Sequence, residues 1–302
     1  GRLREIGRRH QHDEQAAKNR ADIGQPGQHG ANQAERPGAR KAEQPQAQPE
    51  RQRVEHRKPE QTLKIGARGA IHLGDQFLLY YTARDAASGK QCVGVAISDN
   101  PRRGFRDDHD QPLVCQSEEG GTIDASPFRD GDRLYLYFKN DGNCCGIPTY
   151  IYVQELAADG QSLLGESARL IRNDEPWEGH VIEAPTMWLH AGQYYLFFSA
   201  NNYAGFEYSV GYAVCEAATG PCQDAAENPI LASRMEDQPL VVGPGHQTLI
   251  QVGNQTWIVY HVWNVLPSGI RGDSRMMWID RLDWSSGNPV VLGPTYDPQL
   301  KP

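Results

Sequence analysis

The chain lacks several features that mark common protein classes. No apolar run reaches the ~18 residues that a membrane-spanning helix needs, and no long stretch has the 3.6-residue period of an amphipathic helix. The six cysteines include no CxxC pair, which argues against a structural zinc site. The formal net charge is −8 and the pI is 5.7, so no positive field favours nucleic acid or anionic lipid.

Aromatic residues are missing from the first part of the chain. Residues 1–62 contain no Trp, Tyr or Phe and are rich in Gln, Arg, Glu, Ala, Gly and Pro. Such a composition buries too little apolar area to offset the entropy cost of ordering. We therefore expect residues 1–66 to be a disordered tail, or the product of out-of-frame translation, and the folded domain to span residues 67–302.

One strand pattern occurs four times in the rest of the chain. It reads GDQFLLYYTA from Gly74, GDRLYLYFKN from Gly131, GQYYLFFSA from Gly192 and NQTWIVYHVW from Asn254. Hairpin partners such as CVGVAIS, YIYVQEL and SVGYAVC follow the first three strands after turn clusters. An aromatic-rich strand that recurs every ~40–60 residues is typical of a β-propeller. We expect an all-β fold with blades near residues 70–115, 122–171, 181–232 and 243–263, the last completed by RMMWIDRLDW.

An acidic or imidazole side chain precedes three of the four strands. TIDASPF carries Asp124, VIEAPTM carries Glu183 and GPGHQTL carries His246. Equivalent positions of successive blades converge near the axis of a propeller. We therefore expect these three side chains to share one central polar site.

The apolar neighbours of Asp124 and Glu183 suggest a specific chemistry. Burial raises the pKa of a carboxyl group, and a second carboxylate nearby raises it further. Such a pair can supply the protonated acid that glycosidic-bond cleavage requires. The alternative is that each side chain only caps a turn; the repetition in successive blades favours a site.

Five further residues are candidates with weaker signals. His246 is either a buried histidine or a channel residue that holds a water molecule or a metal ion. Arg275 could pair with the carboxylates, bind a sugar hydroxyl or be a surface residue. Trp177 could stack on a sugar ring or pack under its loop, and Asn202 and Tyr203 follow a core strand in a similar place.

Several long segments resemble glycoside hydrolase family 43. They are TIDASPFRDGDRLYLYFKNDGN, WEGHVIEAPTMWLHAGQYYLFFSANNY, VGPGHQTLI and RMMWIDRLDW, which lie in order over residues 70–292. The resemblance implies a five-bladed propeller and hydrolysis with inversion by a general base, a pKa-tuning Asp and a general acid. By motif, Asp124 matches the tuning Asp, Glu183 the general acid, and His246 a channel histidine that often sits by a bound calcium.

One part of the family pattern has no match. The general base of the family is an Asp in the first blade, and Asp13 and Asp22 lie in sequence that resembles no blade. IGARGA stands where the repeat predicts an acidic motif, and codons for its last five residues, read one base later, can spell Ala-Pro-Glu-Val. We therefore expect the first blade to be missing or garbled, with a rate loss of ~10²–10⁴-fold for want of a base.

The segments KNDGN, PWEG and GPC resemble the arabinose-releasing members most. The resemblance implies an enzyme that removes terminal α-L-arabinofuranosyl units from arabinan or arabinoxylan. A β-xylosidase and a non-catalytic carbohydrate-binding propeller are the alternatives. It also implies a monomer that needs no cofactor, with structural Ca²⁺ as an option, and that binds plant cell-wall polysaccharide rather than nucleic acid or membrane. Such an enzyme is expected to be secreted, although no signal-peptide pattern is visible.

The cysteines form two candidate pairs. Cys215 and Cys222 flank a short turn, and Cys92 and Cys115 end neighbouring strands, so both pairs can bridge in a secreted protein. Cys144 and Cys145 are adjacent, and we expect no bridge between them because it would require strain.

Overall fold

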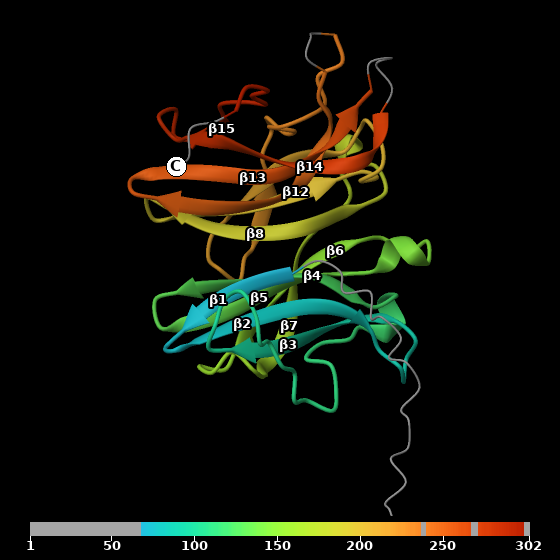
Figure 1. The fold of residues 1–302 in the computed structure, drawn as a ribbon, viewed down its shortest axis with the longest axis vertical. Helices are drawn as coiled ribbons and strands as arrows, with labels where there is room; N and C mark the ends of the chain where they lie inside the picture. The colour runs from blue at the N-terminus through green and yellow to red at the C-terminus, as the bar shows by residue number, and fades with distance from the viewer. Residues whose placement is uncertain (1–67, 237–239, 267–270, 299–302) are drawn as a thin grey trace, which may run out of the picture. The chain divides into compact units, whose positions relative to one another are not determined.

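The computed structural model describes residues 68–236, 240–266 and 271–298 (Figure 1). Within these residues the chain forms four antiparallel sheets and three short 3₁₀ turns, η1 (Ser117–Glu119), η2 (Gly142–Cys144) and η3 (Pro176–Glu178). No helix in this part of the chain is long and apolar enough to cross a membrane. The expected tail, residues 1–66, lies outside the described residues.

Each sheet is built from strands that are consecutive in the sequence. The first has the order β1 (Arg68–Leu73), β2 (Gln76–Arg84), β3 (Gln91–Ser98). The second has β4 (Thr122–Asp130), β5 (Arg133–Asn140), β6 (Tyr150–Leu156), β7 (Leu163–Arg172). The third has β8 (Ile182–His190), β9 (Gln193–Ala200), β10 (Ser209–Cys215), β11 (Cys222–Asp224). The fourth has β12 (Val242–Val252), β13 (Gln255–Val265), β14 (Arg271–Asp283), β15 (Val290–Val291).

The hairpin turns explain the register of these sheets. Leu73 pairs with Gln76 and Asp130 with Arg133, so two residues connect the strands in each case. Gly74 and Gly131 begin these turns with φ values of 57° and 58°, a conformation that glycine adopts without steric cost. The repeated Gly-Asp pair of the sequence is therefore a turn signal that fixes which strand face is buried.

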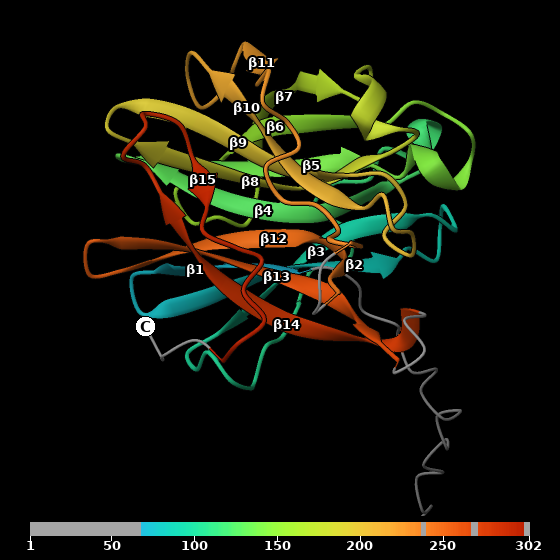
Figure 2. The same ribbon diagram turned by 90° about the horizontal axis from the view of Figure 1, so that it is seen from above.

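Alternation along the middle strands places each sheet between two cores. On β5, Tyr135 and Tyr137 face the third sheet, whereas Leu136 and Phe138 face the first. On β9, Phe198 faces the second sheet and Phe197 faces the fourth. The sheets therefore stack face to face in sequence order, as the expected blades require (Figure 2). Each fully buried side chain of this kind contributes about 1.5–3 kcal/mol of transfer free energy.

The all-β prediction and the four blade positions are confirmed. The predicted hairpin partners correspond to β3, β6 and β10, and RMMWIDRLDW lies on β14 and just beyond it. The outer strands β7, β11 and β15 were not predicted, because β7 is mostly exposed and the other two are very short.

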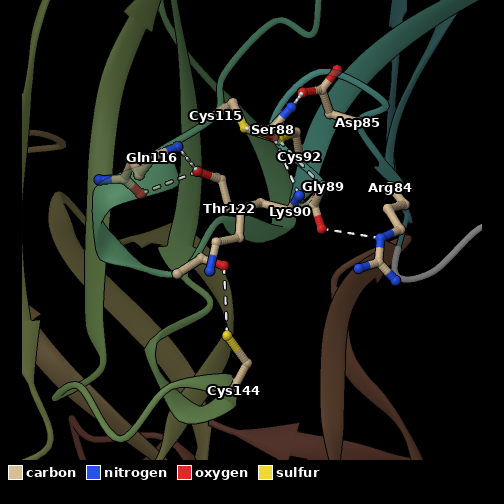
Figure 3. The surroundings of a disulfide bond; sticks show 11 residues. Arg84, Asp85, Ser88, Gly89, Lys90, Cys92, Cys115, Gln116, Thr122 and Cys144 are labelled. Atoms are coloured by element: carbon tan, nitrogen blue, oxygen red, sulfur yellow. Dashed lines mark hydrogen bonds between the residues drawn. A yellow bond between two sulfur atoms is a disulfide. The ribbon is translucent and has the colours of Figure 1, made fainter.

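The structure confirms both expected disulfides and corrects a third expectation. Cys215 and Cys222 face each other across β10 and β11 and are bonded, and Cys92 is bonded to Cys115 (Figure 3). Cys144 and Cys145 are also bonded to each other, so the expectation that they do not bridge was wrong. Cys144 ends η2 and Cys145 is its C-cap residue. The Cys144 Sγ also lies 3.6 Å from the carbonyl oxygen of Gly120.

Candidate active site

The first strands of three sheets carry the same irregularity. β4, β8 and β12 lose their register with the next strand between Ile123 and Ser126, Glu183 and Thr186, and Gly245 and Thr248. A β-bulge of this kind re-aims side chains at the edge of a blade.

At each bulge one residue has a positive φ. The values are 58° at Asp124, 54° at Ala184 and 52° at His246. Asp124 and His246 therefore occupy equivalent positions, whereas Glu183 comes one residue before the equivalent position. The expectation that all three residues are equivalent is therefore wrong by one residue for Glu183. Positive φ is uncommon for residues with a β-carbon and is often retained at functional sites.

The bulges bring the three side chains together. Each of Asp124, Glu183 and His246 offers an oxygen or nitrogen atom within 4.8 Å of the others. Asp124 is buried and Glu183 is 9% exposed, whereas His246 is exposed. The expected proximity of the three side chains is thus present, and their chemical roles stay predictions.

Burial dominates the electrostatics of Glu183. Desolvation raises the pKa of its carboxyl group, and the negative charge of Asp124 raises it further. Three groups oppose this rise. They are the Lys139 ammonium, whose Nζ lies 3.9 Å from Oε2, the Tyr208 hydroxyl, which donates to Oε1 at 2.5 Å, and His246. Glu183 is therefore a carboxyl group that keeps its proton at a higher pH than an exposed glutamate does.

Asp124 is fixed to the strand that carries Glu183. Its Oδ2 accepts a hydrogen bond of 3.0 Å from the backbone N–H of Ala184. This bond joins the second sheet to the third at the bulge. It therefore holds the charge of Asp124 next to the Glu183 carboxyl group.

A buried amide joins the third sheet to the fourth. The Nε2 of Gln247 donates to the carbonyl oxygen of Ala184 at 2.8 Å, and its Oε1 accepts from the Ser199 hydroxyl at 2.6 Å. The Ser199 oxygen also accepts from the N–H of His246 at 2.8 Å, and Thr186 donates to the backbone oxygen of Gln247. Hydrogen bonds thus connect all three bulges.

Four residues of this site were not among the candidates predicted from the sequence. Lys139 ends an apolar strand, Asp141 follows it, and Tyr208 and His261 are distant in sequence from the carboxylates. The pKa of Asp141 is raised by burial and by Asp124, and opposed by Lys139. Lys139 directly follows the core-strand segment YLYF. This was the one sequence feature that pointed to the site, because a lysine in a buried strand is rarely left without a partner.

The His261 ring packs against the Tyr208 ring. The two rings stack with centroids 5.5 Å apart. Burial lowers the pKa of His261 to about 3, with Arg275 and His246 acting in the same direction. His261 is therefore a neutral ring at physiological pH and adds no charge to the site.

Arg275 and Tyr203 lie together on an aromatic surface. The Arg275 guanidinium is 5.5 Å from the centre of the Tyr203 ring and 5.7 Å from that of Trp263. Tyr203 is 49% exposed, so its ring is accessible to a ligand. Arg275 is close enough to His261 to affect its charge, which places this surface beside the site.

The other two candidates have structural contacts. The Trp177 ring packs on Phe198, and its edge contacts Gly211, where any side chain would collide with it. This corresponds to the packing alternative for Trp177. Asn202 is exposed, and its Oδ1 accepts from the N–H of Ala204. A role for either residue in substrate binding stays a prediction.

The spacing of the carboxylates limits their roles. In an inverting glycosidase the acid and the base are ~6.5–9.5 Å apart, because a water molecule must lie between them and the sugar. One carboxyl oxygen of Asp124 lies within 4.8 Å of one carboxyl oxygen of Glu183, which favours direct electrostatic contact between the two groups over an intervening water molecule. Asp124 is therefore suited to tune Glu183 rather than to activate water.

The same three groups do not fit calcium as a complete shell. Calcium takes 6–8 oxygen ligands, whereas this set offers two carboxylates and one imidazole. Asp124 and Glu183 also already accept hydrogen bonds from Ala184 and Tyr208. We therefore assign no metal ligand here, and no step below involves a metal.

The four described sheets and the buried carboxyl group of raised pKa fit a glycoside hydrolase of the propeller type. Comparison with known proteins makes the assignment specific. A model of the glycosyl hydrolases family 43 matches residues 51–289. The chain belongs to this family, whose members hydrolyse glycosidic bonds.

Curated relatives and solved structures agree with this assignment. A probable arabinan endo-1,5-alpha-L-arabinosidase A of Aspergillus fumigatus is 25% identical over 70% of this chain and 68% of its own length. A probable arabinan endo-1,5-alpha-L-arabinosidase C of Aspergillus flavus is 27% identical over 73% and 72%. A thermostable family-43 glycoside hydrolase has a TM-score of 0.70 and 34% identity, over 79% of this chain and 78% of that protein. An endo-1,4-beta-xylanase of Bacteroides thetaiotaomicron has a TM-score of 0.64 and 27% identity, over 76% and 75%.

Proposed function

We propose that this protein hydrolyses α-L-arabinofuranosyl bonds of arabinan or arabinoxylan with inversion, at chain ends, and that Glu183 is the general acid. The observation that carries the proposal is the environment of Glu183. Its carboxyl group is buried, has a raised pKa and lies beside a second carboxylate, that of Asp124.

The reaction follows from these contacts. Glu183 gives its proton to the glycosidic oxygen while the bond from that oxygen to the anomeric carbon breaks. The bonding electron pair leaves with the oxygen, and a water molecule attacks the anomeric carbon from the opposite face. Asp124 keeps Glu183 protonated before the step, and Tyr208 keeps the carboxyl plane in place through Oε1.

The base that activates this water is proposed to lie on a fifth sheet, outside the described residues. The face of β1–β3 opposite its core supports this proposal. Leu79, Tyr81, Gly94 and Ala96 line a hollow of about 460 Å³ there, and charged residues such as Arg84, Asp85 and Asp107 share its lining. The small and apolar residues on this second sheet face are typical of a surface that packs against another sheet. We propose the expected domain bounds, a propeller domain over residues 67–302 with residues 1–66 as a tail, so that the fifth sheet is missing or garbled in this chain.

The names of the relatives favour arabinan as the substrate and also a second candidate, cleavage within the chain. Both Aspergillus relatives are named as probable endo-acting arabinosidases. The solved structure named as a xylanase keeps the β-xylosidase alternative open. The exposed Tyr203 ring with Arg275 is the surface on which we place the sugar beside the cleaved bond.

Product analysis tests the proposal. The full chain is incubated with linear α-1,5-arabinan and with aryl α-L-arabinofuranoside and aryl β-D-xyloside. Release of arabinose alone supports cleavage at chain ends, and release of short oligosaccharides supports cleavage within the chain. Release of xylose only would overturn the arabinose assignment. Binding of arabinan without any product from these substrates, over prolonged incubation, would favour the carbohydrate-binding alternative.

A further inference from the structure

Lys139 is a fully buried cation that the reaction scheme above does not use. It is the seventh residue of β5, between the core residue Phe138 and the buried Asn140, and its exposed fraction is 0%. Removing an ammonium group from water costs several kcal/mol unless other groups compensate. The compensating groups therefore indicate why the lysine is there.

One compensating group is an amide on a rigid turn. The Lys139 Nζ donates to Asn143 Oδ1 at 2.8 Å. Asn143 is the middle residue of η2, which is closed by the hydrogen bonds of Cys144 and Cys145 to Asp141 and Gly142 and followed by the Cys144–Cys145 bond. The ammonium group thus has a fixed position.

The remaining compensation comes from the acids of the site. The Nζ lies 3.9 Å from Glu183 Oε2, which is beyond hydrogen-bond distance but within strong electrostatic range. Lys139 also acts on the charge of Asp141, which in turn feels Asp124. The charged or titratable groups that face Glu183 are therefore Asp124 on β4, Lys139 on β5, Tyr208 before β10 and His246 on β12.

We propose that Lys139 is a positioning residue that stabilises the carboxylate which Glu183 becomes when it gives up its proton. Tyr208 already holds Oε1, so Oε2 is the oxygen that faces the lysine. Before proton transfer the neutral acid needs no cation, and the 3.9 Å gap is tolerated. After transfer, the negative oxygen is attracted to an ammonium group that Asn143 has already oriented, so little reorganisation is required. This inference rests on the proposed role of Glu183 as the acid.

The test reads the charge of Glu183 directly and needs no turnover. The full chain is labelled with ¹³C at the Glu side-chain carboxyl carbon, and the Glu183 signal is assigned by its loss in Glu183→Gln. Its NMR titration midpoint is then compared between wild type and Lys139→Met, which has similar volume and no charge. Loss of an opposite charge at this range is expected to raise the midpoint by about 1–3 pH units.

Three further variants make the result specific. Lys139→Arg keeps the charge and is expected to restore most of the midpoint. Asn143→Ala keeps the lysine but removes its anchor, and is expected to raise the midpoint by less than Lys139→Met does. Arg133→Gln removes an exposed cation from the same strand, where it pairs with Glu155, and is expected to leave the midpoint unchanged.

A midpoint that is unchanged or lower in Lys139→Met overturns the proposal. If Lys139→Met does not melt cooperatively, Asn143→Ala decides: a raised midpoint supports the proposal and an unchanged one overturns it. The proposed function is tested separately, by product release. A chain that cleaves no arabinofuranoside can still show a raised titration midpoint of Glu183 in Lys139→Met.

Discussion

Replacement of Gln247 by leucine is expected to destabilise the protein far more than a typical surface change. Gln247 is 3% exposed and links the third sheet to the fourth through its side-chain amide. Leucine has a similar volume and neither donor nor acceptor. The variant therefore leaves the carbonyl oxygen of Ala184 and the hydroxyl of Ser199 without their present partners.

The magnitude follows from those two losses. A buried polar group left without a partner costs about 1–3 kcal/mol. The Ser199 oxygen keeps the N–H of His246, so the lower part of that range applies to it. We expect a total loss of about 2–4 kcal/mol in the free energy of unfolding. For a domain of this size that corresponds to a fall in Tm of roughly 5–12 °C.

Thermal unfolding followed by circular dichroism measures this fall. Gln154→Leu is the matched control, because Gln154 donates one hydrogen bond, to the carbonyl oxygen of Gly165, at an exposed position. We expect a change below about 2 °C for the control. A fall below about 2 °C for Gln247→Leu as well would refute the view that this amide holds the bulges of two sheets together.

Three further predictions follow from the same contacts. In a version of the chain with a first blade that supplies an Asp base, Glu183→Gln is expected to nearly abolish cleavage of arabinan and to spare activated aryl arabinofuranosides more, because their aryl group leaves without a proton; rates on both substrates check this. Asp124→Asn is expected to lower the titration midpoint of Glu183, because a charge that raises its pKa is lost; the ¹³C titration checks this. Burial raises the pKa of Glu178 to about 7 from 4.5, so the folded state binds a proton that the unfolded state has released between those pH values. Glu178 therefore makes stability fall as the pH rises from about 4.5 to 7, and Glu178→Gln is expected to show a smaller fall than the wild type between thermal melts at pH 5 and pH 8.

The strands were predictable because their signals are local. Turns with a glycine of positive φ and alternating aromatic residues need no information from elsewhere in the chain, and they located β2, β5, β9 and β13. The candidate pair Asp124 and Glu183 was predictable for a related reason. Both residues precede a copy of the repeated strand, and such positions in successive blades lie near the propeller axis.

The remaining parts of the site depend on long-range packing. Tyr208 reaches Glu183 only because β8 and β10 flank β9 in the same sheet. Ala184 takes a positive φ that alanine disfavours, so its sequence gave no sign of the bulge. Lys139 is buried because β5 packs against β8. This packing places its ammonium group 3.9 Å from the Glu183 carboxyl group on β8.

The central claim is that Glu183 and Asp124 form the acid side of an inverting arabinofuranosyl hydrolase, in a chain whose first blade, and with it the general base, is missing or garbled. The most direct measurement is turnover of an activated aryl α-L-arabinofuranoside by the full chain, with and without sodium azide. Azide needs no base in order to attack the anomeric carbon. The account predicts slow hydrolysis in water, faster turnover with azide, and a β-L-arabinofuranosyl azide product of inverted configuration. An azide product of retained configuration, or no turnover even with azide, would contradict it.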